Sequence, residues 1–452
     1  MANYIDKGLQ VSISNRDILK IALPITAALL IPNINFITNN IFLGGLGERE
    51  LGNAGTVGVY YLIMMVIGNG LNNSLQSLIS RQAGTGDLRS INVIFAQGIR
   101  ISLLFAVMGM LITWFIAPLC LKPFISPGNF ELEMEFLRIR VLGLPFLYLF
   151  QMGNAFLVGT LNSKSLMIGF VGEALLNIFF DYVLIYGEWG FPNLGFNGAA
   201  WASVIAEFGG MCIVYSVIYF KGFKEKFNLF NNFSHHGATA KSILNRSAPL
   251  VMQYVISLTT WLVFFILLEQ YGDRAKAISN AMRNVFGIVG VFIWAFASTS
   301  NTVVSNLIGQ GLQDRVISAI NRITLLSFTA TFCMAALLNI FPETFLHLFQ
   351  QDQQFVEEAK PIIRIISLGM LIMSIAAVWL NAVTGTGKTR MNLLIELAAV
   401  IMYILYIYIV MVYLRLSLAW AWTNEFIYWL AIFGLAFWYM KSGKWKEKNI
   451  NG

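Results

Sequence analysis

Three polar side chains recur at four-residue intervals inside a long apolar stretch of the chain. They are Glu173, Asn177 and Asp181, so on an α-helix they lie on one face. An ionisable side chain inside a membrane span costs about 3 kcal/mol or more and is rarely retained without a function. We therefore expect Asp181, with Asn177 beside it, to take up and release a proton or to ligate Na⁺. The alternative is a structural carboxylate whose oxygens accept hydrogen bonds from neighbouring hydroxyls or amides.

The residues after this stripe predict a tight turn and a second apolar helix. Residues 190–195 read Gly-Phe-Pro-Asn-Leu-Gly, and residues 198–203 read Gly-Ala-Ala-Trp-Ala-Ser. Gly and Pro favour a turn, and the small residues that follow let two helices pack closely. Together with the Asn-x-x-x-Asp spacing of Asn177 and Asp181, this block resembles the signature of the multidrug and toxic compound extrusion (MATE) transporters.

The resemblance extends over about residues 20–440 through further short motifs. These are Ala22-Leu23-Pro24, Gly84-Thr85-Gly86-Asp87, Leu-Arg-Ile-Arg-Val-Leu-Gly-Leu-Pro at 137–145, and Gly385-Thr386-Gly387. The resemblance implies a secondary-active antiporter of prokaryotic type. Such a transporter would export amphipathic, often cationic, organic compounds in exchange for H⁺ or Na⁺ by alternating access. The runner-up function is a lipid or lipid-linked oligosaccharide flippase of the same superfamily, which would tend to have a cationic cleft.

The resemblance also implies which residues join Asp181. Ser203 stands where the family has a small hydroxyl side chain. Many prokaryotic members carry a carboxylate in the first span, shortly before a Gly-x-Leu-Gly sequence, and this chain has Asn39 there. Asn39 offers a carbonyl oxygen but cannot carry a proton, which puts a two-carboxylate proton mechanism in doubt. Glu173 could supply the missing charge, or it could face a central cleft as a substrate contact.

Three more polar side chains in or near apolar runs are candidates for a substrate cleft. Glu207 follows Ser203 by four residues, so it either extends the polar pocket or points to its inner end. Gln253 and Glu396 belong to the second half of the chain. Glu396 is the better candidate for a cleft carboxylate. The alternative is a residue at a helix end that is solvated at the cytoplasmic surface.

Proline and arginine positions give two further expectations. Pro24 removes a helix hydrogen bond, so it either permits the first span to bend as a hinge or simply lies near the start of the helix. Arg138 and Arg140 fall near the outer end of the fourth span, where we expect their side chains to snorkel to the interface.

The composition is that of a helical, polytopic membrane protein. Hydrophobic residues make up 57% of the 452 positions and charged residues only 12%, where a soluble domain has about a quarter charged. The net charge of +7 does not indicate a nucleic-acid partner, because Lys and Arg lie between spans. Cys120, Cys212 and Cys333 fall in apolar runs and are expected to pack without disulfides. We expect no cleavable signal peptide, no cofactor and no enzymatic activity, since no clustered catalytic motif or P-loop occurs.

The apolar runs predict twelve transmembrane helices in two six-helix bundles. An N-terminal bundle over 1–220, a cytoplasmic linker over 221–248 and a C-terminal bundle over 249–452 account for the chain, because 221–248 is its longest polar segment. The expected spans are 18–43, 51–80, 92–121, 133–159, 165–187, 196–220, 245–269, 277–307, 318–347, 361–384, 391–413 and 417–440.

The two halves repeat each other. Pro24 and Pro249, like Ser80 and Ser305, are 225 positions apart, and later landmarks such as Gly143 and Gly369 are 226 apart. A constant offset with one slip indicates duplication. Six spans per repeat preserve orientation, so the pseudo-two-fold axis runs along the membrane normal, with a cleft between the halves.

The distribution of basic residues predicts the orientation of the chain. Lys and Arg gather in the N-terminal segment, the linker over 221–248 and the C-terminal tail, which an even number of spans places on one side. By the positive-inside rule, both termini are cytoplasmic and the protein is a multi-pass protein of the bacterial inner membrane. Its expected partners are the lipid bilayer, small amphipathic molecules and H⁺ or Na⁺, and we expect a monomer.

Overall fold

The computed structural model describes residues 7–123, 125–230, 236–347 and 353–446, and within these ranges it contains helices and no strands. Ten segments are long and apolar enough to cross a membrane, and one of them, Gly237–Gly309, holds two long helices. Since a helix needs about 20 apolar residues to span a bilayer, the prediction of an all-α polytopic membrane protein is confirmed.

The chain folds into two compact units. Unit 1 contains Ala27–Ser247, and unit 2 contains Ala248–Gly452 together with Gln10–Thr26. The division falls after Ser247, and Gln10–Thr26 packs with the second half of the chain.

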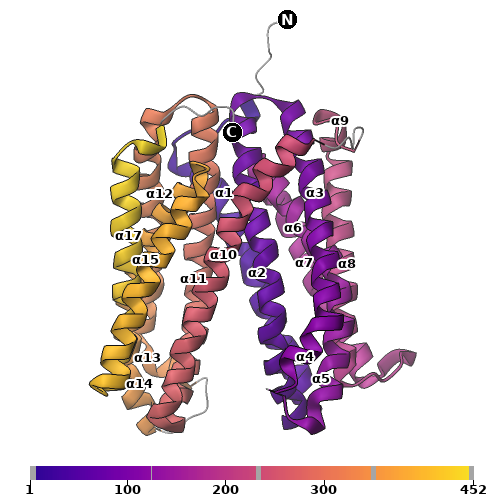
Figure 1. Ribbon diagram of the computed structural model, residues 1–452, viewed down its shortest axis with the longest axis vertical. Helices are drawn as coiled ribbons and strands as arrows, with labels where there is room; N and C mark the ends of the chain where they lie inside the picture. Colours follow the sequence, from indigo (N-terminus) through magenta and orange to yellow (C-terminus); the bar gives the residue numbers. More distant parts are fainter. Residues whose placement is uncertain (1–6, 124, 231–235, 348–352, 447–452) are drawn as a thin grey trace, which may run out of the picture. The chain divides into compact units, whose positions relative to one another are not determined.

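The long helices of unit 1 lie side by side, and several helices that pack together are not consecutive in the chain (Figure 1). The closest packing joins α7 to α8, α2 to α6, and α3 to α6. Their bounds are α1 Asn15–Gly44, α2 Glu48–Thr85, α3 Leu88–Leu111, α4 Ala117–Leu121, α5 Pro127–Arg140, α6 Leu144–Gly159, α7 Ser163–Tyr186, α8 Phe196–Phe220 and α9 Phe223–Lys226.

Unit 2 contains the later helices of the chain, from the part of α10 that follows Ser247. Its long helix α11 has 38 residues, as α2 has, in accordance with the predicted duplication. The bounds are α10 Gly237–Leu267, α11 Gly272–Gly309, α12 Val316–Ile340, α13 Pro342–His347, α14 Gln353–Gly385, α15 Thr389–Ile407, α16 Leu418–Trp422 and α17 Asn424–Lys441. The predicted linker over 221–248 is not wholly irregular, since α9 and the start of α10 lie within it.

Two membrane spans of unit 1 are interrupted helices. A π-helical turn at Ile112–Ile116 separates α3 from α4, and a 3₁₀ turn at Val141–Gly143 separates α5 from α6. Pro145 stands at the start of α6, where its missing N–H costs no hydrogen bond. Such turns within a span often mark functional positions. The second interruption begins directly after Arg140.

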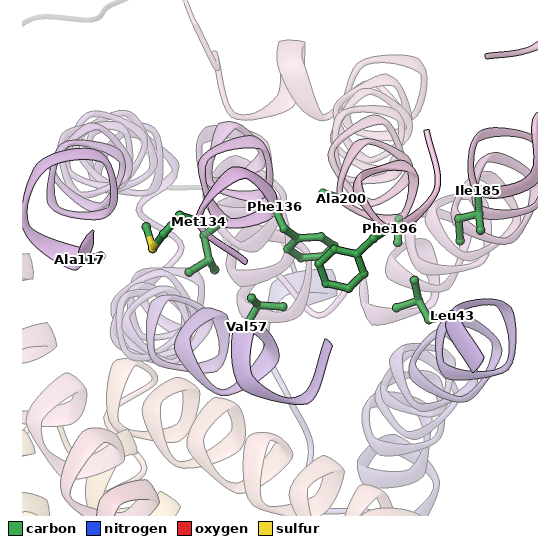
Figure 2. Packing of buried hydrophobic residues seen from close by; sticks show 10 residues of the cluster. Leu43, Val57, Ala117, Met134, Phe136, Ile185, Phe196 and Ala200 are labelled. Atoms are coloured by element: carbon green, nitrogen blue, oxygen red, sulfur yellow. The ribbon is translucent and has the colours of Figure 1, made fainter. Parts of the chain in front are cut away.

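An apolar cluster fills one end of unit 1 and fixes the ends of α1 and α7 (Figure 2). Leu43 of α1 and Ile185 of α7 are buried there with Phe196 of α8. Phe196 also packs on Phe136 of α5, with ring centroids 4.6 Å apart. Because the C-terminal ends of α1 and α7 meet in this cluster, the two helices run in the same direction.

Candidate functional site

Helices α7 and α8 form an antiparallel pair in which glycines of α8 receive side chains of α7. A Cβ at Gly210 would lie 2.9 Å from the Cβ of Glu173, and a Cβ at Gly198 would lie 2.6 Å from the carbonyl oxygen of Leu184. Only glycine permits this approach, so the pairing register is fixed. The register brings Ser203 near the level of Asp181 and Glu207 near the level of Asn177.

Asp181 is fully buried, and neither of its carboxylate oxygens has a hydrogen-bond partner among the described residues. Asn177, one turn earlier on the same face, is also buried, and its side-chain amide nitrogen has no partner either. A buried carboxylate without partners is too costly to stay charged and alone. The described residues therefore do not supply the hydroxyl or amide partners of the structural alternative.

Asn39 lies on α1, which is adjacent to α7 at this depth. The ring centroids of Phe42 and Tyr182 are 6.4 Å apart, and the hydroxyl of Tyr186 donates to the carbonyl oxygen of Phe42 at 2.7 Å. Asn39 precedes Phe42 by three residues, about 4.5 Å along the helix axis, so it is close to the level of Asp181. Its side-chain oxygen is buried and accepts no hydrogen bond from the described residues.

Buried side-chain oxygens without a hydrogen-bond partner among the described residues are present at Asp181 and Asn39, whereas at Asn177 the unpartnered atom is the amide nitrogen. Ser203 is half-buried on the facing helix. Oxygen ligands of this kind suit Na⁺, and the carboxylate alone suits a proton. Among the described residues, no group of three or more His, Cys, Asp or Glu side chains could hold a metal ion.

Glu207 is held in a buried ion pair that the sequence did not predict. Arg140, the last residue of α5, donates to both carboxylate oxygens of Glu207, at 2.9 and 2.7 Å. The guanidinium also lies over the ring of Tyr61, 3.7 Å from its centroid, and the Tyr61 hydroxyl donates to Glu207 at 3.0 Å. The interface position expected for Arg140 is therefore wrong. Its side chain is only 14% exposed, because it turns inward to this carboxylate.

The break between α5 and α6 makes room for this pair. A Cβ at Gly143 would lie 2.1 Å from one carboxylate oxygen of Glu207 and 3.0 Å from the guanidinium of Arg140. Gly143 thus lets the carboxylate reach the backbone of the 3₁₀ turn. Removing one partner of such a buried pair typically costs about 3–5 kcal/mol.

Glu173 lies beside this pair and is half-buried. Gly210, against which Glu173 packs, is on α8 three residues after Glu207, and residues at this spacing are neighbours on a helix. Glu173 interacts electrostatically with both Glu207 and Arg140, and Arg140 also interacts with Asp181. Two carboxylates, Glu173 and Glu207, therefore lie near the guanidinium of Arg140.

In unit 2 the structure brings Gln253 and Glu396 together. Glu396 is only 1% exposed, so the alternative of a helix-end residue solvated at the surface is wrong. Tyr428 donates to its carboxylate at 2.5 Å, and the hydroxyls of Tyr428 and Ser257 are 2.9 Å apart. Gln253 lies beside the carboxylate, and its own side-chain oxygen is buried without a hydrogen-bond partner.

Glu425 of α17, another polar residue in an apolar run of the second half, is also buried. It packs against Gly369, the residue that repeats Gly143, and accepts a hydrogen bond from Trp429 at 2.9 Å. Both units thus seat a glutamate of their last long helix against the same glycine of their fourth span. The pairing of Gly143 with Gly369 was the signal that could have suggested this.

A family model decides what kind of protein carries these sites. The model of the MatE family matches residues 24–183 and again residues 249–409. The chain belongs to the MatE family. The two matches begin 225 positions apart and end 226 positions apart, the same offsets that the repeated landmarks give, so the duplication is confirmed. The family consists of transporters, and the prediction that the chain is not an enzyme is confirmed by that membership.

Individual relatives agree with this membership. The chain is 24% identical over 404 residues to a probable multidrug resistance protein NorM of Thermotoga maritima, covering 88% of this chain and 85% of the relative. Its fold matches a MOP superfamily transporter from Pyrococcus furiosus, with a TM-score of 0.87, 18% identity and 98% of both chains covered. An outward-facing multidrug resistance MATE transporter gives a TM-score of 0.87 at 17% identity, covering 97% of this chain and 98% of that one.

Proposed function

We propose that this MatE-family protein is a secondary-active antiporter that exports amphipathic, often cationic, organic compounds in exchange for H⁺ or Na⁺. Relatives that are named multidrug resistance proteins support the substrate class. The observation that carries the coupling is Asp181, a fully buried carboxylate without a hydrogen-bond partner among the described residues. Burial of such a carboxylate is favourable when a cation neutralises it and unfavourable when it is charged and without a partner. Binding of the cation at Asp181 would therefore favour the conformation in which Asp181 is buried.

In this proposal, the coupling cation binds at Asp181 and is released when the transporter changes between outward-open and inward-open states. Asn177, Asn39 and Ser203 provide neutral oxygens around the carboxylate. Glu173 provides the second negative charge, which in many prokaryotic family members comes from a carboxylate at the position of Asn39. Gln253 and Glu396 of unit 2 contribute to substrate binding, because Glu396 is a buried carboxylate that an organic cation could neutralise.

The bend required for the change of state is assigned to Pro24. Pro24 lies nine residues after the start of α1, which supports the hinge over the helix-start alternative. The boundary between the two units crosses α1 between Thr26 and Ala27, one turn or less beyond this proline. A proline without a backbone N–H weakens the helix at that point. We place the protein, as a monomer, in a bacterial inner membrane with both termini in the cytoplasm.

Dye efflux from everted membrane vesicles tests the proposed function. One arm imposes a pH gradient with the Na⁺ gradient collapsed, and the other imposes a Na⁺ gradient with the pH gradient collapsed. We expect one arm to drive transport of a cationic dye. A third arm follows a fluorescent anionic lipid in proteoliposomes. Lipid movement without dye transport would replace the proposal by the flippase alternative, and transport of the dye without either gradient would exclude antiport.

A further inference from the structure

The buried ion pair of Arg140 and Glu207 places a permanent positive charge near a further carboxylate of unit 1, that of Glu173. The guanidinium is held on Glu207 by two hydrogen bonds and on the face of Tyr61. Glu173 lies one turn from Glu207 across the α7–α8 contact, with a carboxylate oxygen 3.3 Å from the place of a Cβ at Gly210. The permanently charged guanidinium of Arg140 therefore lies near the carboxylates of Glu173 and Asp181, which must be unpaired to bind the coupling cation in the proposed mechanism.

An arginine released in this position would compete with the coupling cation. Its guanidinium is charged at all accessible pH values and binds carboxylates with two parallel hydrogen bonds. If Glu207 did not hold it, Glu173 or Asp181 would be the available counter-charge. The carboxylate so neutralised could no longer bind or release H⁺ or Na⁺.

We propose that Glu207 is a positioning residue that sequesters Arg140, so that Glu173 and Asp181 remain free to exchange the coupling cation. This inference rests on the proposed coupling function. Glu207 itself carries no coupling cation, because two N–H groups of Arg140 and the Tyr61 hydroxyl already occupy its carboxylate. Gly143 allows this arrangement, since any side chain there would displace the Glu207 carboxylate.

The proposal makes an unusual prediction for a pair of variants. E207Q frees Arg140, so gradient-driven efflux should fall by about tenfold or more. An effect of this size lies within the range of interaction energies found for residues in contact. R140M/E207Q removes both charges together and should recover most of the transport. A merely structural pair predicts the opposite, because the double variant then loses both partners and does no better than E207Q. E135Q, an exposed glutamate of α5, is the matched control and should transport as the parent does.

A second measurement does not depend on the folding of the double variant. In detergent, purified E207Q should bind the dye, but the binding should no longer weaken when the concentration of the coupling cation is raised. Four groups interact with Glu207 and can influence how dye binding responds to the cation concentration. They are Arg140, Glu173, Tyr61 and Tyr148. Dye binding by E207Q that still responds to the cation as in the parent would overturn the inference.

The inference and the proposed function fail in different experiments. E173Q and D181N should each abolish coupled efflux, and normal efflux in both would overturn the coupling site. If E173Q and D181N are both inactive, the coupling site stands. The proposed role of Glu207 is then wrong if E207Q transports normally, or if R140M/E207Q is as stable as the parent protein but still inactive.

Discussion

At the scale of single residues, the chemistry of unit 1 depends on which buried charges have partners. Asp181 has none among the described residues, whereas Glu207 is bound by Arg140 and Tyr61. Two carboxylates about one helical turn apart in level on this helix pair therefore differ in their partners. We propose that a mobile cation neutralises Asp181, whereas Arg140 already neutralises Glu207.

The sharpest residue-level prediction concerns Asp181. D181N keeps the shape of the side chain but removes the charge that a proton or Na⁺ would neutralise, so efflux should fall to the level of vesicles without the protein. Dye binding in detergent should persist. D314N is the control, because Asp314 is exposed and, within the described part of the chain, pairs with Lys446 at 2.7 Å. Efflux near the parental rate in D181N, at matched expression, would move the coupling role to another carboxylate.

The sequence predicted the polar stripe of α7 but missed the partner of Glu207. Spacing within one helix showed that Glu173, Asn177 and Asp181 share a face, whereas Arg140 and Glu207 are 67 positions apart and meet only through tertiary packing. A usable signal was present, since Arg138 and Arg140 are two residues apart and so point to nearly opposite sides of a helix. If one reaches the interface, the other faces the bundle.

At the scale of elements, the interruption of the fourth span should be sensitive to side-chain volume. G143A places a Cβ 2.1 Å from the Glu207 carboxylate and should lower stability by about 1–3 kcal/mol, the usual cost of overpacking. Thermal unfolding in detergent measures the change. G128A is the control, because a Cβ there meets nothing within 4 Å. Equal melting temperatures for both variants would show that the turn yields without cost.

Bending of α1 gives a second prediction at this scale. P24A restores a backbone N–H near the place where α1 passes from unit 2 to unit 1, so it should stiffen the helix and slow transport while expression is unchanged. P32A is the comparison, since Pro32 lies eight residues farther on, wholly within unit 1. If P32A slows efflux as much as P24A does, bending is not localised at Pro24.

The positions of the spans could be predicted from the sequence, but the interruptions within them could not. Apolar runs of about 20 residues have few interpretations in a membrane protein, so each expected span is matched by a long helix or a pair of shorter ones. The breaks at Ile112–Ile116 and Val141–Gly143 depend on contacts between helices, such as that of Gly143 with Glu207. Periodicity along one segment contains no information about them.

At the scale of the whole molecule, the orientation in the membrane follows from the basic segments. Reporters fused after Lys446 and within 221–248 should both give a cytoplasmic signal, because Lys and Arg concentrate there. A reporter placed after Trp189, in the exposed turn between α7 and α8, should give the opposite signal. A matching signal from all three positions would contradict the twelve-span orientation.

The contacts of the N-terminal segment with the second half affect how the chain is made. The N–H of Val11 donates to Asn306 at 2.9 Å, and Gln310 and Arg322 donate to the carbonyl oxygens of Val11 and Ile13. At about 5–20 residues per second, roughly 15–60 s separate the synthesis of the two partners. Val11 and Ile13 are therefore synthesised about three hundred residues before their hydrogen-bond partners in unit 2. A second half expressed by itself should be unstable and should be rescued by the N-terminal segment supplied as a separate peptide.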